Sequence, residues 1–144
     1  MKILFDTSVI IAAMVESHPL HPIAFPWLKR AKSKEFDLFI ACHTLAELYA
    51  VLTTLPVRPK ISPAVACQLI HHNIEPMARI VSLSASDYRF VIKRMGDLEL
   101  SGGIIYDALI ARAAQRFKVD RILTFNIDDF KRVWPEGITH ITMP

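Results

Sequence analysis

The sequence predicts an α/β fold, a three-layer α/β/α arrangement in which helices cover both faces of a central parallel sheet. Three observations favour this fold class. Short apolar runs of strand length alternate with longer segments that are bounded by helix caps, prolines and glycines. The runs are almost continuously apolar, which is typical of parallel strands buried on both faces. The 144 residues are 52% hydrophobic and contain no linker or repeat, so we expect a single domain over residues 1–144.

The expected elements follow from the caps and breakers along the chain. Asp6-Thr7-Ser8 closes the first apolar run and can cap a helix, two groups of prolines separate helices, and Gly102-Gly103 marks a loop. The expected strands are Lys2 to Phe5, Leu38 to Ala41, Arg79 to Leu83, Arg121 to Phe125 and Ile138 to Thr142. The expected helices are Val9 to Val15, one that starts at the first prolines and runs into the basic Lys29 to Lys34, His43 to Leu55, Ala64 to His72, Ser86 to Met95, Ile104 to Phe117 and a short one after Asp128.

Composition excludes several classes of protein. The formal net charge of +3 permits a polyanionic partner without requiring one. Cys42 and Cys67 lie far apart and outside any CxxC motif, so we expect reduced thiols in the core rather than a zinc ribbon or a disulfide scaffold. No apolar run has the length of a membrane span, and no secretory signal is evident, so we expect a cytoplasmic protein without a membrane segment.

Three carboxylates stand alone in apolar stretches. Asp6 is the only formal charge between residues 3 and 15, Glu47 the only one between 38 and 57, and Asp107 the only one between 100 and 111. Such stretches are expected to be buried, and a buried carboxylate needs a partner. Because the same stretches contain no Lys or Arg, we expect the three acids to meet around a cation that the chain does not encode.

Each acid also has a purely structural interpretation. Asp6 can cap the helix that follows it. Thr44 and Glu47 have the spacing of a capping box, and Asp107 can occupy the first turn of a helix, where the helix dipole favours an acid. Three caps would not explain why other charges are absent around every one of them.

A fourth polar cluster follows the strand expected at residues 121–125. It contains Asn126, Asp128 and Asp129, which can also be an ordinary cap and ordinary first-turn acids. In an open α/β sheet, ligands bind beyond the carboxyl ends of the strands. Because Asp6 also directly follows a strand, we expect both clusters to border one crevice.

Electrostatics indicates the chemistry of such a crevice. Two carboxylates ~4 Å apart repel by about 4 kcal/mol at an effective dielectric constant near 20, so one of them binds a proton unless a cation intervenes. Oxygen ligands favour Mg²⁺, or Mn²⁺, over zinc. His43 and Glu47 have the spacing of a zinc pair, but zinc would need further ligands, and we expect His43 to be a helix-start residue. Mg²⁺ activates water and holds phosphate, which implies phosphodiester hydrolysis.

Four motifs occur in order along residues 3 to 130. They are ILFDTSVI at 3–10, TLAEL at 44–48, YDALIA at 106–111 and TFNIDDF at 124–130. Each motif alone is weak, but the ordered set resembles the PIN domain family. Within that family it most resembles the VapC-type toxin ribonucleases of bacterial and archaeal toxin–antitoxin pairs.

The resemblance implies a parallel sheet in the order 3-2-1-4-5, with the acids at the carboxyl ends of its strands. It makes Asp6 and Asp107 the principal metal ligands, while Glu47 and a fourth acid hold a second ion or orient the water. Many such sequences have Asn where this chain has Asn126 and an acid three residues further on, so Asp129 is favoured over Asp128 as the fourth catalytic residue. Four further side chains are candidates for supporting the ligands or contacting the substrate: Thr7, Ser8, Thr124 and Asn126.

The resemblance also implies the partners. These are an RNA substrate cut to 5′-phosphate and 3′-hydroxyl ends, a small antitoxin protein of a type II pair that blocks the crevice, and a second copy of the chain in a homodimer. If metal neutralised the four acids, 17 basic side chains would face ten remaining acidic ones, which suits a nucleic acid. One candidate phosphate-contacting patch, or alternatively a solvated helix face, consists of Lys29, Arg30, Lys32 and Lys34.

Two other functions are compatible with parts of the pattern. A phosphatase-like or receiver-like phosphoryl-transfer domain also places an Asp after its first strand. However, Ser8 occupies the place of the second Asp of the haloacid dehalogenase signature, and the acidic pair and late Lys of a receiver are missing. A catalytically silent PIN-like interaction subunit would retain the fold, and the uncharged Asn126 is compatible with it.

The phosphoryl-transfer alternative requires a phosphoaspartate at Asp6, whereas the nuclease interpretation predicts none. Incubation with acetyl phosphate and Mg²⁺ should leave the intact mass of the protein unchanged, with a receiver domain as the positive control for the mass measurement. A stable phosphorylated species would reject the nuclease interpretation.

Overall fold

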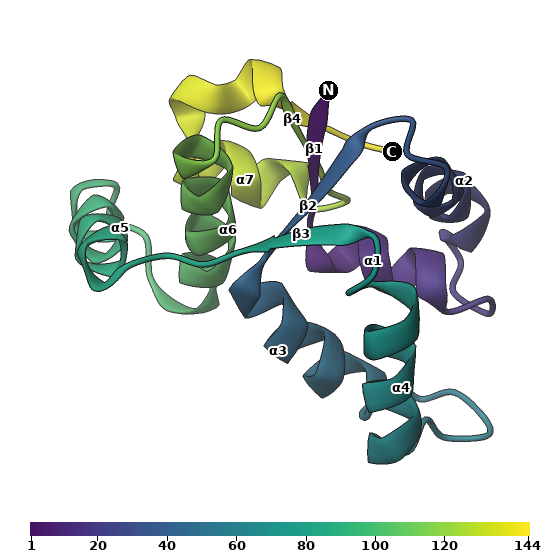
Figure 1. Ribbon diagram of the computed structural model, residues 1–144. Helices are drawn as coiled ribbons and strands as arrows, with labels where there is room; N and C mark the ends of the chain where they lie inside the picture. The colour runs from purple at the N-terminus through teal and green to yellow at the C-terminus, as the bar shows by residue number, and fades with distance from the viewer.

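Five short strands form one parallel sheet in the computed structural model, which describes all 144 residues (Figure 1). The strands are β1 (Lys2–Phe5), β2 (Asp37–Ala41), β3 (Ala78–Val81), β4 (Arg121–Leu123) and β5 (Ile141–Thr142). Their order is β3-β2-β1-β4-β5, and every neighbouring pair is parallel. The predicted α/β class and the strand order 3-2-1-4-5 are therefore confirmed.

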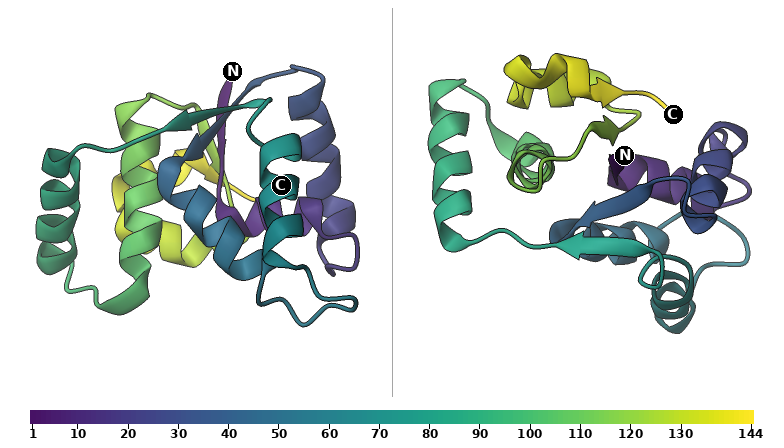
Figure 2. Two further views of the ribbon diagram at one scale, coloured as in Figure 1. Left: turned by 60° about the horizontal axis from the view of Figure 1, so that its bottom comes forward. Right: turned by 45° about the horizontal axis from the view of Figure 1, so that its top comes forward.

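Helices cover both faces of this sheet. They are α1 (Thr7–Met14), α2 (His21–Lys32), α3 (Cys42–Leu52), α4 (Pro63–Asn73), α5 (Ala85–Asp97), α6 (Ile105–Arg116) and α7 (Ile127–Val133), with the 3₁₀ helices η1 (Gly102–Ile104) and η2 (Pro135–His140). In the left view of Figure 2, α5 and α6 lie on one side of the strands and α2 and α4 on the other. None of these helices combines the length and the apolar character that a membrane crossing needs.

Side chains alternate along each strand, so the central strand β1 contributes to two cores. Ile3 and Phe5 pack into a core of 20 buried residues that includes the inner faces of α1 to α4. Leu4, between them, packs into a second core of 17 buried residues that includes α5, α6 and α7. Because each face of the sheet has its own full layer, β1 is fixed from both sides.

The carboxyl ends of β1 and β4 lie next to each other at the centre of the sheet. Phe5 pairs with Leu123 across the two strands, and the backbone N–H of Asp6 donates to the Leu123 carbonyl at 3.0 Å. The residues that follow the two strands, Asp6 and Thr124, therefore begin side by side. The order of the strands reverses at this point, which is where open α/β sheets form their crevice.

Some predicted boundaries differ from the observed ones. The strand expected over 121–125 ends at Leu123, because the two residues after it turn toward the loop that follows β1. The last strand contains only Ile141–Thr142, because Pro135 starts a 3₁₀ helix over most of the expected range. Helix α3 ends at Leu52 rather than Leu55.

The prediction that both cysteines lie in the core is wrong. Cys42 and Cys67 are free and exposed. Cys42 is the first residue of α3, and Cys67 lies on the outer face of α4, whose buried positions are Ala66 and Ile70. The apolar neighbours of each cysteine therefore do not report which way its own side chain faces.

A buried ion pair fastens α5 to α6. Asp87, in the first turn of α5, is 4% exposed and forms a capping box with Ser84. Its Oδ1 accepts a hydrogen bond from Arg112 Nε at 2.9 Å, and Arg116 Nε lies 3.4 Å from the same oxygen. Burial alone would raise the pKa of Asp87, but the Ser84 hydrogen bonds and the two arginines outweigh it and lower that pKa. This pair holds in place the helix that carries Asp107.

Asp87→Ala should lower the free energy of unfolding at neutral pH by roughly 2–4 kcal/mol, because it removes a helix cap and the buried partner of Arg112. Since the pKa of Asp87 is lowered by folding, this contribution is complete at neutral pH and is lost as the pH falls through the lowered pKa. Urea unfolding followed by circular dichroism at neutral pH and at about pH 3 measures both effects.

Asp97→Ala is the matched control, because it removes the exposed Lys93–Asp97 pair on the same helix. It should cost less than about 1 kcal/mol. Equal losses from the two variants would contradict the role given to Asp87.

Candidate active site

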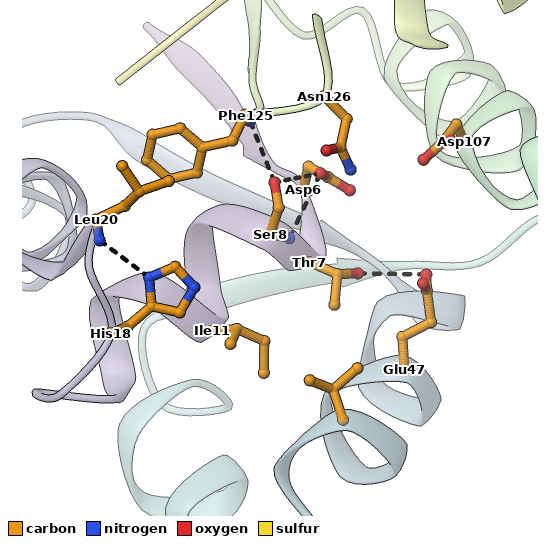
Figure 3. Close-up of a pocket in the computed structure, with 11 residues that line it drawn as sticks. Asp6, Thr7, Ser8, Ile11, His18, Leu20, Glu47, Asp107, Phe125 and Asn126 are labelled. Atoms are coloured by element: carbon orange, nitrogen blue, oxygen red, sulfur yellow. Dashed lines mark hydrogen bonds between the residues drawn. The ribbon is translucent and has the colours of Figure 1, made fainter. Parts of the chain in front are cut away.

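Asp6 is the centre of a polar network at the carboxyl edge of the sheet. It follows β1 directly and caps α1, and it is only 2% exposed. Its Oδ2 accepts hydrogen bonds from Ser8 Oγ at 2.6 Å, from the Ser8 backbone N–H at 3.4 Å and from Thr124 Oγ1 at 2.8 Å (Figure 3). Because all three bonds go to Oδ2, the carboxylate is held in one orientation while Oδ1 accepts none of them.

The same network joins the loop after β1 to the loop after β4. The buried Thr124 hydroxyl donates to Asp6 and accepts from the backbone N–H of Asn126 at 2.9 Å. The Ser8 hydroxyl also donates to Asp6 and accepts from the backbone N–H of Phe125 at 3.2 Å. Ser8 and Thr124, which the sequence predicts as supporting groups, thus both contact the Asp6 carboxylate.

Glu47 reaches the crevice from the second turn of α3. Its Oε1 accepts a hydrogen bond from Thr7 Oγ1 at 3.2 Å, which links α3 to the first residue of α1. Helix α3 begins at Cys42, so Thr44 lies inside the helix and the capping-box interpretation of Glu47 is wrong.

His43 connects the helix of Glu47 to the helix of Asp107. It is the second residue of α3, as expected of a helix-start residue, and its Nε2 lies 3.4 Å from Glu47 Oε1 without hydrogen-bond geometry. Its ring stacks on Tyr106 of α6, with the ring centres 4.7 Å apart and the planes within 7° of parallel. This stack fixes the spacing of the two helices beside the acids.

Asp107 lies in the first turn of α6, and no hydrogen bond or ion pair satisfies its half-buried carboxylate. Figure 3 shows the carboxylate turned toward Asn126 and Asp6. The helix-dipole interpretation of Asp107 therefore describes its place in the helix, but it does not account for the direction in which the side chain points.

Burial makes the carboxylates of this site harder to ionise. Burial raises the pKa of Asp6, against the hydrogen bonds from Ser8 and Thr124. Burial likewise raises the pKa of Glu47, with His43 opposing the shift and the Asp6 charge adding to it. These carboxylates are therefore harder to ionise than free ones as long as no cation lies between them.

The pKa of Asp107 responds both to burial and to the neighbouring charges. Burial, followed by the charges of Asp6, Asp129 and Glu47, raises the pKa of Asp107 to about 7. Since Asp6, Asp129 and Glu47 each raise the pKa of Asp107, the four acids lie within electrostatic reach of one region. Such a group of like charges is the electrostatic condition that a divalent cation relieves.

The structure separates the three candidates for the fourth acidic position. Asp129 is half-buried, and its charge acts on Asp107, although its Oδ1 also lies 3.4 Å from Arg132 Nη1. Asp128 is exposed and has no influence on the pKa of Asp107. Asn126 lines the cavity itself. In the structure, the Asp129 charge therefore acts on the acidic group, the Asp128 charge does not, and Asn126 forms part of the cavity wall.

A cavity of about 360 Å³ opens between these elements. Its wall consists of Asp6, Thr7, Ser8, Ile11, His18, Leu20, Glu47, Val51, Asp107, Phe125 and Asn126, and thus contains no Lys or Arg. Neither the apolar members nor His18 were predicted from the sequence. The turn between α1 and α2 folds the half-buried ring of His18 into the wall.

The donors of this cavity fit a hard divalent cation. Asp6 Oδ1 and both oxygens of Asp107 accept no hydrogen bond from the protein, and Glu47 lies across from them (Figure 3). Mg²⁺ prefers oxygen ligands and binds proteins through one or two carboxylates while it retains several waters. In keeping with so open a site, no three His, Cys, Asp or Glu side chains surround a common point in the structure.

Comparison with known proteins identifies the fold family. The model of the PIN domain family matches residues 3–134. The chain belongs to the PIN domain family. The ribonuclease VapC27 of Mycobacterium tuberculosis is 31% identical over 115 residues, which cover 80% of this PIN domain chain and 78% of the relative. The ribonuclease VapC40 of the same species is 29% identical over 112 residues, which cover 76% of each chain.

Solved structures share the fold of this PIN domain. Mycobacterium tuberculosis VapC20, described as a sarcin–ricin loop cleaving toxin, superposes with a TM-score of 0.70 at 16% identity, over 88% of this chain and 92% of the other. FitAcB of Neisseria gonorrhoeae superposes with a TM-score of 0.66 at 20% identity, over 91% of this chain and 92% of the other. The structure of VapBC2 from Rickettsia felis bound to a DNA fragment from the VapBC2 promoter superposes with a TM-score of 0.67 at 21% identity, over 99% of this chain and 98% of the other.

In this PIN domain, Asp107→Asn should stabilise the metal-free protein at alkaline pH and leave it unchanged at acidic pH. Because folding raises the pKa of Asp107 to about 7, the folded state retains a proton that the unfolded chain releases near pH 4, and stability falls as the pH rises through this window. Allowing for solvent screening, we expect a gain of roughly 1–3 kcal/mol at about pH 8 and none at about pH 4.

Chemical denaturation in EDTA measures this difference. The exposed neighbour variant Asp128→Asn is the control and should change stability little at either pH. The absence of a gain for Asp107→Asn at about pH 8 would show that the acids do not repel one another in the folded protein.

Proposed function

We propose that this chain is a Mg²⁺- or Mn²⁺-dependent endoribonuclease that hydrolyses RNA phosphodiester bonds. One observation carries the proposal: Asp6, Glu47 and Asp107, from three separate segments, face one cavity whose wall contains no Lys or Arg. The acids therefore require a cation from solution. Two relatives of similar length, at 31% and 29% identity, are named ribonucleases, which supports RNA as the substrate class.

Asp6 and Asp107 are the proposed ligands of that cation. A bound Mg²⁺ would neutralise the acids, activate a water molecule and stabilise negative charge on the phosphate. Ser8 and Thr124 donate hydrogen bonds to Asp6 Oδ2 and so fix the orientation of the carboxylate, which leaves Oδ1 available to the cation.

Glu47 and Asp129 are the proposed groups that orient water. Because the pKa of Glu47 is raised, its carboxylate is more basic than usual and can accept a proton from the attacking water. The water oxygen then bonds to phosphorus while the bond to the 3′ oxygen breaks, and that oxygen takes up a proton. The products are a 5′-phosphate and a 3′-hydroxyl end.

The surface charge favours a nucleic acid. With the four acids neutralised, 17 basic side chains face ten acidic ones. Lys29, Lys32 and Lys34 of the predicted basic patch are exposed at the end of α2. Arg30 of the same patch instead pairs with Glu35 at 2.8 Å, so three of the four charges are available for phosphates.

We further propose that the chain is the toxin of a type II toxin–antitoxin pair. The VapC names of the relatives and the toxin description of VapC20 support this assignment. The family resemblance then implies a small antitoxin protein that covers the crevice, and it implies a homodimer.

Asp6→Asn and Asp107→Asn should each lower the rate of RNA cleavage by more than about 100-fold, because each removes a charged ligand of the cation. Thr124→Val should lower it by about 10- to 100-fold, since Asp6 would lose one of its orienting donors. Total bacterial RNA incubated with Mg²⁺, followed by sequencing of newly formed 5′ ends, measures cleavage.

Asp97→Asn, at the exposed end of α5 and outside the cavity wall, is the matched carboxylate control and should cleave like the wild type. EDTA should abolish cleavage, and Mg²⁺ should raise the melting temperature of the wild type but not that of Asp6→Asn. Cleavage that persists equally in Asp6→Asn would place the activity elsewhere or in a contaminant. An inactive wild type that still binds RNA would favour the silent interaction subunit.

A further inference from the structure

The acidic centre occupies only one end of the cavity in Figure 3. The other end, here called the apolar recess, is formed by Ile11, His18, Leu20, Val51 and Phe125. Its four apolar members come from α1, from the turn before α2, from α3 and from the loop after β4, so the recess is built by the same elements that position the acids. His18 is its only polar member.

The hydrogen bonding of His18 defines what it offers to a ligand. The backbone N–H of Leu20 donates to His18 Nδ1 at 3.1 Å. A ring nitrogen that accepts a hydrogen bond carries no proton, so the neutral ring carries its proton on Nε2. No protein group accepts a hydrogen bond from Nε2, and Figure 3 shows this nitrogen turned away from Leu20 toward the other side chains of the cavity. His18 therefore presents one N–H in a fixed direction.

We infer that the apolar recess binds one nucleobase of the RNA substrate and that His18 Nε2–H donates to an acceptor on the edge of that base. A nucleobase has two apolar faces and hydrogen-bond acceptors on its edge, which matches an apolar recess with a single donor. Phe125 offers an aromatic ring against which the base can stack. This inference rests on the proposed ribonuclease function and makes His18 a specificity-determining residue for it.

The position of the recess supports a base rather than another apolar group. The recess and the acids share one cavity of about 360 Å³, and a base lies only one sugar away from the phosphate that its own backbone places at the acids. An aliphatic side chain of a protein partner would fill the same recess but would leave the His18 N–H buried without an acceptor, which is unfavourable. The donor thus distinguishes between the two kinds of occupant.

His18→Asn tests the donor while preserving the turn. The Asn side chain ends near the position of Nδ1 and can still accept from the Leu20 N–H, but it has no group at the position of Nε2. His18→Gln restores an amide N–H near Nε2 and is the rescue variant. His72→Asn is the matched control, because His72 is exposed on α4 and does not line the cavity.

The readout is the base composition beside the cuts that each variant makes in total bacterial RNA. We expect a base preference at one position in the wild type, a weakening of that preference by roughly 3- to 10-fold in His18→Asn, and partial recovery in His18→Gln. In the Asp6→Asn background, binding of an RNA oligonucleotide with the preferred base should weaken by a similar factor on His18→Asn, as measured by fluorescence anisotropy.

The outcomes separate this inference from the function on which it rests. No cleavage by the wild type would reject the proposed ribonuclease, whereas cleavage with an unchanged base preference in His18→Asn would overturn only the role of His18. If circular dichroism shows that His18→Asn is unfolded, the wild type is tested instead on an RNA oligonucleotide that carries an abasic nucleotide at the preferred position. Cleavage that slows by the same factor supports the base site, and unchanged cleavage overturns it.

Discussion

The carboxylate of Asp6 and the two hydroxyls that donate to it are the interaction on which the rest of the site depends. A carboxylate at 2% exposure is costly unless it is hydrogen-bonded, and Ser8 and Thr124 supply those bonds through Oδ2 alone. The same hydroxyls accept backbone N–H groups from the loop after β4. One buried charge thus determines both the direction of a ligand oxygen and the closure of two loops.

The sheet brings the remaining acids to this point from opposite faces. Helix α3, with Glu47, belongs to the layer packed on Ile3 and Phe5, and helix α6, with Asp107, belongs to the layer packed on Leu4. The His43–Tyr106 stack links the two layers at the crevice. Rigid elements hold these acids close together in a half-buried place. Burial, followed by the charges of the other acids, raises the pKa of Asp107 to about 7.

The resemblance to the PIN domain family was sufficient for the strand order. The apolar runs were sufficient to single out the acids as candidates, because isolated charges in such runs are visible without coordinates. The sequence was insufficient wherever side-chain direction decides. Cys42 and Cys67 face solvent although most residues around them in the sequence are apolar. Thr44 and Glu47 have the spacing of a capping box, but Thr44 lies inside helix α3 rather than at its start. The place of His18 in the cavity wall depends on a turn between two helices, and no local pattern encodes the direction in which that turn points its ring.

The bond between Thr124 and Asp6 joins residues 118 positions apart in the chain. A nascent chain on the ribosome therefore contains Asp6, Glu47 and Asp107 well before it contains the residue that orients the first of them. Strand β4, which pairs with β1, is likewise synthesised after all three acids. The organised centre consequently arises only after residue 124 has been synthesised, so a shorter polypeptide carries the three acids without the hydrogen bond that orients Asp6.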